Sequence, residues 1–174
     1  LPPKMAPFVR EWWRHSIAAA LLAQQCGQDL PTDHAYTAAL LHGIGQLALF
    51  EDAPQDYPNL VERSYAEGLN LLECEREAFS VDHAALAGLI LESWGLPEEL
   101  CEAVAKHHDA DAETGLAVVV QTGCAASEHL GFGRCGCPEH AGAQTPSASA
   151  ALFENFSSFD SLAVQINQIE WSQG

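Results

Sequence analysis

Apolar side chains recur every three or four residues along most of this chain, which is the spacing of one face of an α-helix. The first such segment starts at Val9 and stops at Gly27, and the second starts at Asp33, a residue type that caps helix N-termini. The pattern contains neither the strict alternation of a β-strand nor a hairpin turn. It predicts an all-α fold, with later helices within residues 59–79, 82–94, 97–108, 116–130 and 159–171.

Residues 38–50 carry almost no polar side chains, so we expect this segment at the centre of the fold. Gly43 and Gly45 within it predict a helix break or a close helix contact. Gly68 is a weak point in the helical pattern around it, and Asp82 is expected to cap the helix that follows. The apolar face predicted for that helix consists of Leu86, Leu89, Ile90 and Trp94.

The length of 174 residues suits a single domain over residues 1–174, and a hydrophobic content of 48% excludes a disordered chain. Residues 134–149 lack periodicity and are predicted to form a flexible loop. No apolar run approaches the roughly 18 residues of a membrane span, and no signal-peptide pattern follows the N-terminal basic residues. We therefore expect a cytoplasmic protein with no membrane contact.

Acidic residues outnumber basic ones by 24 to 7, which gives a formal net charge of −17. A surface of this charge repels a phosphate backbone, so direct nucleic-acid binding is not expected.

Six cysteines are present, and most are interpreted as small buried hydrophobic residues, including Cys74, Cys101 and Cys124 within helical segments. Cys135, Cys137 and His140 have the spacing C-x-C-x-x-H. This spacing is not a standard zinc pattern, and no second paired half follows, so no structural zinc is predicted there.

Three segments carry a recognisable order of motifs: WWRHS at 12–16, ALLHGIGQL at 39–47, and DHAALAGLILESWGLPEEL, which starts at 82 and is followed by a histidine pair at 107–108. Together they resemble the HDOD family, bacterial signalling output domains related to HD phosphohydrolases and HD-GYP phosphodiesterases. The resemblance covers roughly residues 8–133 and implies an HD-superfamily helical bundle. The family usually carries a further helical half upstream, and this chain begins near the family's midpoint.

In catalytic HD proteins a histidine, a His-Asp pair and a distant aspartate hold a metal that activates water against a phosphoester. The resemblance places the first histidine at His15 and the histidine of the pair at His42. The paired aspartate falls on Gly43, and the distant aspartate falls on or near Gly123. No aspartate lies between positions 111 and 160 under any nearby register.

The rest of the HD pattern maps onto imidazoles and one amide. The lysine that normally follows the pair falls on Gln46, and the further histidines fall near His83 and on His107 or His108. HDOD domains are known for metal sites that have lost some of their ligand residues. The resemblance therefore implies a residual pocket with no catalytic residue, no metal and no cofactor.

For these residues, a purely structural role and a functional role both remain open. His15, His42 and His83 are either hydrogen-bonded core histidines or a residual transition-metal site. His107 and His108 either stabilise a helix C-terminus or line a pocket. Tryptophans 12, 13 and 94 are interpreted as core, and glutamates 73, 75 and 77 as a solvated helix face.

The sequence leaves three alternative functions for this chain. The first is a regulatory module that binds a protein partner in a signalling pathway. The second is an atypical metal-dependent phosphohydrolase or phosphodiesterase that uses the histidine cluster. The third is a nucleotide or small-ligand binder without turnover. Gly43 and Gly123 argue against the second and do not separate the first from the third. We expect His15 and His42 to face each other, and the two glycines to serve tight helix packing. The sequence leaves the oligomeric state open.

Overall fold

The computed structural model describes residues 6–27, 32–109 and 115–132 of the chain. The helices in these ranges are α1 (Ala6–Cys26), α2 (Thr32–Leu41), α3 (Ile44–Asp52), α4 (Asp56–Glu67), α5 (Leu71–Phe79), α6 (His83–Ser93), α7 (Glu98–Ala105) and α8 (Leu116–His129). No strand occurs in the described ranges, and the all-α prediction is confirmed. Within the same ranges, none of the helices combines the length and the apolar character needed to cross a bilayer.

Local signals in the sequence set several of the helix ends. The Asp82 carboxylate accepts the backbone N–H of Ala85 at 2.8 Å, so Asp82 caps α6 as predicted. Gly68 ends α4 in the left-handed region at φ +65°, so the pattern at 59–79 becomes two helices. The break at His42 and Gly43 separates α2 from α3.

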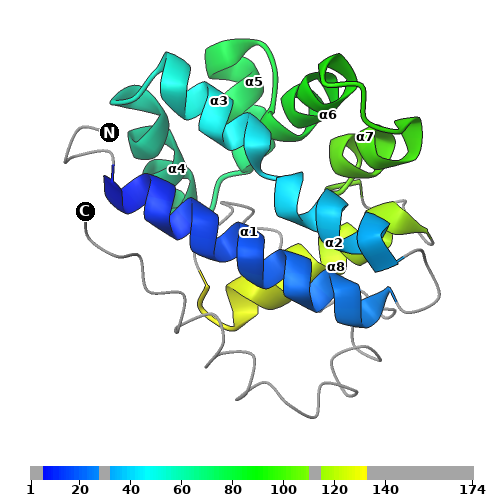
Figure 1. Cartoon of the computed structure of the whole chain (residues 1–174). Helices are drawn as coiled ribbons and strands as arrows, with labels where there is room; N and C mark the ends of the chain where they lie inside the picture. Colours follow the sequence, from blue (N-terminus) through cyan, green and yellow to red (C-terminus); the bar gives the residue numbers. More distant parts are fainter. Residues whose placement is uncertain (1–5, 28–31, 110–114, 133–174) are drawn as a thin grey trace.

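Helix α1 packs along α8 and against α2, and Figure 1 shows α8 lying behind α1 with α2 beside both. The contact between α1 and α8 is close because their facing side chains are small. A Cβ atom added at Gly123 on α8 would lie 2.5 Å from the carbonyl oxygen of Ala19 on α1 and 3.0 Å from the Cβ of Ala23. Gly123 therefore serves tight helix packing.

Helix α6 packs between α3 and α7. At Gly45, α3 approaches the backbone carbonyl of His83 so closely that a Cβ would collide with it, and at Gly88 a Cβ would lie 2.8 Å from the Cβ of Ala105 on α7. These contacts bring the end of α2, the start of α6 and the end of α7 together. Each of these three helix ends carries a histidine.

The apolar face predicted for α6 was wrong in part. Leu89 is 59% exposed and Trp94 is 58% exposed, so Trp94 is not a core residue. Trp12 is in the core. The small residues Ala87 and Gly88 allow α3 and α7 to approach α6 closely. The buried residues of α6 are His83, Ala84, Ala87, Gly88 and Leu91.

Some sequence predictions fall outside the described residues. These are the flexible loop at 134–149, the helix at 159–171, and the loop residues Cys135, Cys137 and His140.

Candidate functional site

Five histidines from separate parts of the chain meet in the interior. His15 comes from α1, His42 from the link between α2 and α3, His83 from the first turn of α6, and His107 and His108 from the end of α7. Each has at most 9% of its surface exposed. The ring centroids form a continuous series, with His15–His42 at 5.1 Å, His42–His107 at 5.0 Å and His107–His108 at 3.9 Å. The structure thus brings together all five histidines singled out in the sequence.

His42 and His107 are held in the same way. Each follows the end of a helix, and its Nδ1 lies 2.6 Å from the carbonyl oxygen three residues earlier, that of Ala39 and Val104 respectively. The last carbonyls of a helix have no intrahelical partner, so they are available as acceptors. Because a carbonyl oxygen only accepts, Nδ1 carries the hydrogen in both rings. In the neutral ring, Nε2 is then left with a lone pair.

His107 stands out among the five because its Nε2 is buried and has no hydrogen-bond partner among the residues that the structure describes. Burial lowers the pKa of His107 well below 6.5, and the neighbouring His108, His42 and His83 lower it further. The hydrogen bond to Val104 opposes this shift. His107 is therefore a neutral imidazole at physiological pH.

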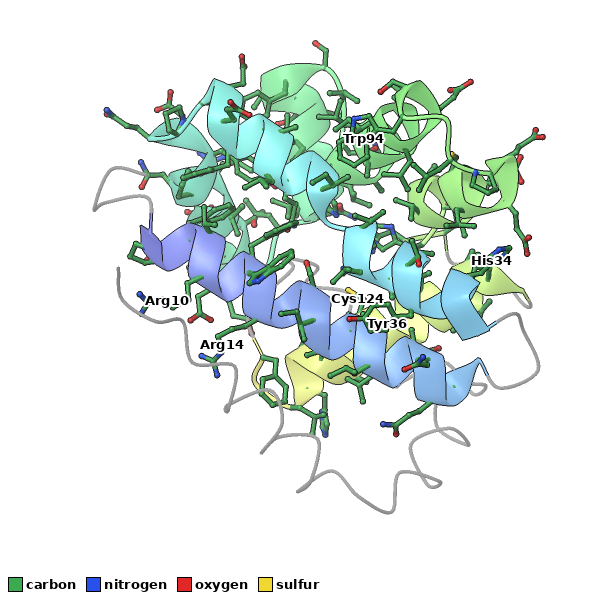
Figure 2. The ribbon with its side chains drawn as sticks, viewed as in Figure 1. Arg10, Arg14, His34, Tyr36, Trp94 and Cys124 are labelled. Atoms are coloured by element: carbon green, nitrogen blue, oxygen red, sulfur yellow. The ribbon has the colours of Figure 1, made fainter. Side chains whose placement is uncertain are left out.

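His15 connects α1 to the end of α8. Its Nδ1 lies 2.7 Å from the Ser127 hydroxyl and 3.2 Å from the carbonyl oxygen of Phe132. Its Nε2 lies 3.2 Å from Nε2 of His42 and 3.5 Å from Sγ of Cys124. In Figure 2, Cys124 lies among the helices behind the ribbon of α1, whereas Arg10 and Arg14 point away from the body of the protein.

A buried glutamate holds the other end of the cluster. One Glu75 oxygen accepts the Tyr57 hydroxyl at 2.6 Å, and the other accepts the backbone N–H of His83 at 2.8 Å and the Nδ1–H of His83 at 2.7 Å. Three donors thus satisfy a carboxylate with no exposed surface. His83 in turn has its Nε2 3.1 Å from Nε2 of His108.

The sequence-based interpretation of Glu75 was wrong. Glutamates 73, 75 and 77 were assigned to one solvated face, but alternate residues of a helix point about 200° apart. In α5, Glu75 is on the buried side and Glu73 and Glu77 are exposed. Helical geometry applied to the alternation would have revealed this.

The structure distinguishes the two residues at the distant-ligand position, which the resemblance placed on or near Gly123. Gly123 faces the backbone of α1, and the next residue, Cys124, lies beside His15. Cys124 and Ser127 therefore contact the histidine cluster, although the sequence analysis treated Cys124 as an ordinary buried thiol. A shift of one residue rotates a helix position by 100°, which decides whether it faces the cluster.

Gln46, the remaining residue of the sequence-predicted pocket, is 4% exposed. It is buried beside a half-open cavity of about 390 Å³ that Phe8, Glu11 and Trp12 also line. The indole of Trp12 separates this cavity from Gly43 and donates its N–H to the Gly43 carbonyl oxygen at 2.7 Å.

Comparison with protein families now bears on this arrangement. The family model described as the HDOD domain matches residues 2–110, which is more than half of the chain. The chain belongs to the HDOD family. No curated protein matches it in sequence.

Solved structures share the fold of this HDOD chain. A putative phosphohydrolase from Shewanella amazonensis SB2B superposes with a TM-score of 0.64 at 17% identity, covering 95% of this chain and 60% of the other. The MmoQ response regulator from Methylococcus capsulatus str. Bath superposes at 0.63 with 23% identity, covering 90% of this chain and 60% of the other.

An HDOD domain protein of unknown function from Geobacter sulfurreducens superposes at 0.58 with 17% identity, covering 91% of this chain and 61% of the other. The chain thus spans about three fifths of the length of the solved structures that it matches. At these identities the comparison establishes the fold alone.

The residues present do not fit the metal centre of catalytic HD proteins. That centre takes an aspartate directly after the second histidine, and here the position is Gly43, covered by the Trp12 indole. The distant aspartate position is a glycine against α1 and then a thiol. Imidazoles and one thiol form a softer donor set than the carboxylates that hold magnesium or manganese.

Proposed function

We propose that this chain is a cytoplasmic regulatory output domain of a bacterial signalling protein, and that it acts by binding a partner protein without hydrolysing phosphoesters. One observation carries the proposal. Gly43 stands where the catalytic pair needs aspartate, and Trp12 fills the adjacent space by bonding to its carbonyl. Membership of the HDOD family, and a response regulator among its structural neighbours, support the signalling role.

The burial of the histidine cluster also supports the absence of phosphoester hydrolysis. A phosphoester and the attacking water must both reach a metal held by these side chains. His15 is 2% exposed and His42 is 1% exposed, so neither offers a surface on which a substrate could bind. Glu75 cannot act as a free base, because three donors already bind it.

The test is turnover by the purified chain in the presence of manganese, nickel, iron or magnesium. The substrates are cyclic dinucleotides, nucleotides and an aryl phosphate. We expect rates equal to those of the His42→Ala variant. Metal-dependent turnover that disappears in His42→Ala would refute the absence of catalysis.

A groove between α6 and α7 is the surface that we assign to the partner. It has a volume of about 700 Å³, and its lining includes the apolar residues Leu89 and Leu96 and the acidic residues Glu92, Glu98 and Glu102. Leu89 is largely exposed, and the nearby Trp94 at the end of α6 is exposed as well. A groove lined by apolar and acidic side chains matches a partner segment with apolar and basic side chains.

Site-specific photo-crosslinking in cells tests this surface. A photoreactive amino acid at position 89 is compared with one at position 62, an exposed position on α4. We expect capture from position 89 only, loss of capture in Trp94→Glu, and a crosslinked peptide that is apolar and basic. Capture of acidic peptides, or equal capture from both positions, would contradict the assignment.

A further inference from the structure

Three ligand atoms of different residues converge in the interior: Nε2 of His15, Nε2 of His42 and Sγ of Cys124, all within 4.8 Å of one another. We propose that these three residues bind one transition-metal ion of the zinc type, in a site where a thiolate takes the place of the lost carboxylates. The site is an addition to the proposed regulatory function and does not depend on it.

The distances between these atoms match those of ligands around one ion. Zinc binds imidazole nitrogen at about 2.0–2.1 Å and thiolate sulfur at about 2.3 Å in tetrahedral geometry, which separates two nitrogens by about 3.3 Å and a nitrogen from a sulfur by about 3.6 Å. The His15 and His42 nitrogens are 3.2 Å apart, and the His15 nitrogen is 3.5 Å from the Cys124 sulfur. An ion therefore needs little movement of these side chains.

The orientation of His42 directs its Nε2 toward Nε2 of His15. Its Nδ1–H is committed to the carbonyl oxygen of Ala39 at 2.6 Å, so Nε2 presents a lone pair toward His15. Histidine ligands of metal sites commonly donate their second ring N–H to a backbone carbonyl or a carboxylate in this way.

His15 has an equivalent support in Ser127 and Phe132. With its hydrogen on Nδ1, His15 donates to the Ser127 hydroxyl at 2.7 Å, while that hydroxyl donates to the Phe132 carbonyl at 3.3 Å. Nε2 of His15 then also carries a lone pair. Two lone pairs 3.2 Å apart repel each other, and a cation between them relieves that repulsion.

Without an ion, the other tautomer of His15 makes the contact a hydrogen bond. The Ser127 hydroxyl would then donate to Nδ1, and Nε2–H of His15 would donate to His42. The proposal therefore predicts that the ion changes the tautomer of His15 as well as the state of Cys124.

Cys124 supplies the charge and the selectivity. On binding, its S–H bond breaks, the proton leaves to solvent and a metal–sulfur bond forms, so affinity rises with pH. A thiolate with two imidazoles favours zinc and cobalt over magnesium or manganese. The three side chains are at most 2% exposed, so the ion stabilises the junction of α1, α2 and α8.

A second group, His83, His107 and His108, also has three nitrogens within 4.8 Å of one another and is the competing location. It lacks a sulfur, so the two groups give different spectra with cobalt. Thiolate coordination produces an intense near-ultraviolet charge-transfer band, and imidazole coordination alone does not.

The experiment refolds the chain from denaturant with Co²⁺ or Zn²⁺ and a phosphine reductant, then measures metal content, the cobalt spectrum and the melting temperature. We expect one ion bound with the thiolate band, a higher melting temperature, and a histidine ¹⁵N spectrum that places the His15 hydrogen on Nδ1. Cys124→Ser and Cys124→Ala should both lose the band, and Ser127→Ala should weaken binding about 10- to 100-fold.

Cys74→Ser is the matched control, because Cys74 is a buried free cysteine on α5 that belongs to neither group. It should keep the band and the affinity. Failure to bind either metal, a band that survives both Cys124 variants, or binding that His108→Gln abolishes while Cys124→Ser does not would each overturn the proposal. None of these outcomes decides whether the chain hydrolyses phosphoesters, since that assay is separate.

Discussion

Trp12 donates its indole N–H to the carbonyl oxygen of Gly43 at 2.7 Å, and a Cβ atom at position 43 would lie the same distance from that indole nitrogen. The hydrogen bond and the absence of a side chain at position 43 depend on each other. In this HDOD chain, an aromatic ring thus closes the space beside Gly43.

Returning a side chain to position 43 should therefore destabilise the protein. Gly43→Ala places a methyl against the indole and is expected to cost about 1–3 kcal/mol of unfolding free energy. Gly43→Asp should cost more, because it also buries a carboxylate near the indole and backbone. Urea unfolding of both variants measures the two contributions. A Gly43→Asp protein as stable as the parent would show that the space is open.

Gly123 should be equally intolerant, for a different reason. The Gly123→Ala methyl would meet the backbone carbonyl of Ala19, which cannot rotate away as a side chain can. We expect a loss of about 1–3 kcal/mol, typical of overpacking, as α1 and α8 move apart. The control is Gln121→Ala, a half-buried position on the same helix. An equal effect of both substitutions in urea unfolding would contradict this account.

Much of the fold follows from local sequence signals. Helical periodicity, the Asp82 cap and the glycine at 68 define elements without knowledge of their neighbours. The proximity of His15 and His42 was predicted too, because both lie in segments that are apolar on most sides and have few other places to bury an imidazole.

The rest depends on which side of each helix meets a neighbour. Glu75 is buried because Tyr57 and His83 come to it from α4 and α6. Cys124 rather than Gly123 meets His15 because α8 is rotated so that its glycine faces α1. Trp94 directly follows the last residue of α6 and is 58% exposed. Such contacts join residues far apart in sequence, and local periodicity does not contain them.

The Glu75 carboxylate should be the most sensitive polar group of the cluster. Glu75→Ala leaves the Tyr57 hydroxyl and the His83 ring without their acceptor, and we expect a loss of about 3–5 kcal/mol, as for a broken buried pair. Tyr57→Phe removes one hydrogen bond without leaving a buried charge alone, and should cost about 1 kcal/mol. Denaturant unfolding of both variants checks the order. Equal losses would mean that His83 contributes nothing through Glu75.

Acid should unfold the protein partly through His107. Burial, then the neighbouring His108, His42 and His83, hold its folded-state pKa well below the value of 6.5 expected in the unfolded chain. Between these two pKa values, the unfolded state binds a proton that the folded state does not. Stability is therefore complete above about pH 7.5 and falls as the pH drops below 6.5, by up to about 1.4 kcal/mol per pH unit.

The His107→Gln variant isolates this contribution. It removes the titrating ring and leaves an amide that can still donate to the Val104 carbonyl, so its stability should fall less steeply between pH 6.5 and 5 than that of the parent. The slopes of unfolding free energy against pH should differ by up to the value for one bound proton, about 1.4 kcal/mol per pH unit, because only one imidazole has been removed. Above pH 8 the His107 ring of the parent and the glutamine amide of the variant are both neutral. The two unfolding free energies should then differ by a constant amount, which serves as the internal control. Parallel curves across the whole range would mean that His107 takes up its proton in the folded protein, and that the cluster opens or shares that charge well before it unfolds.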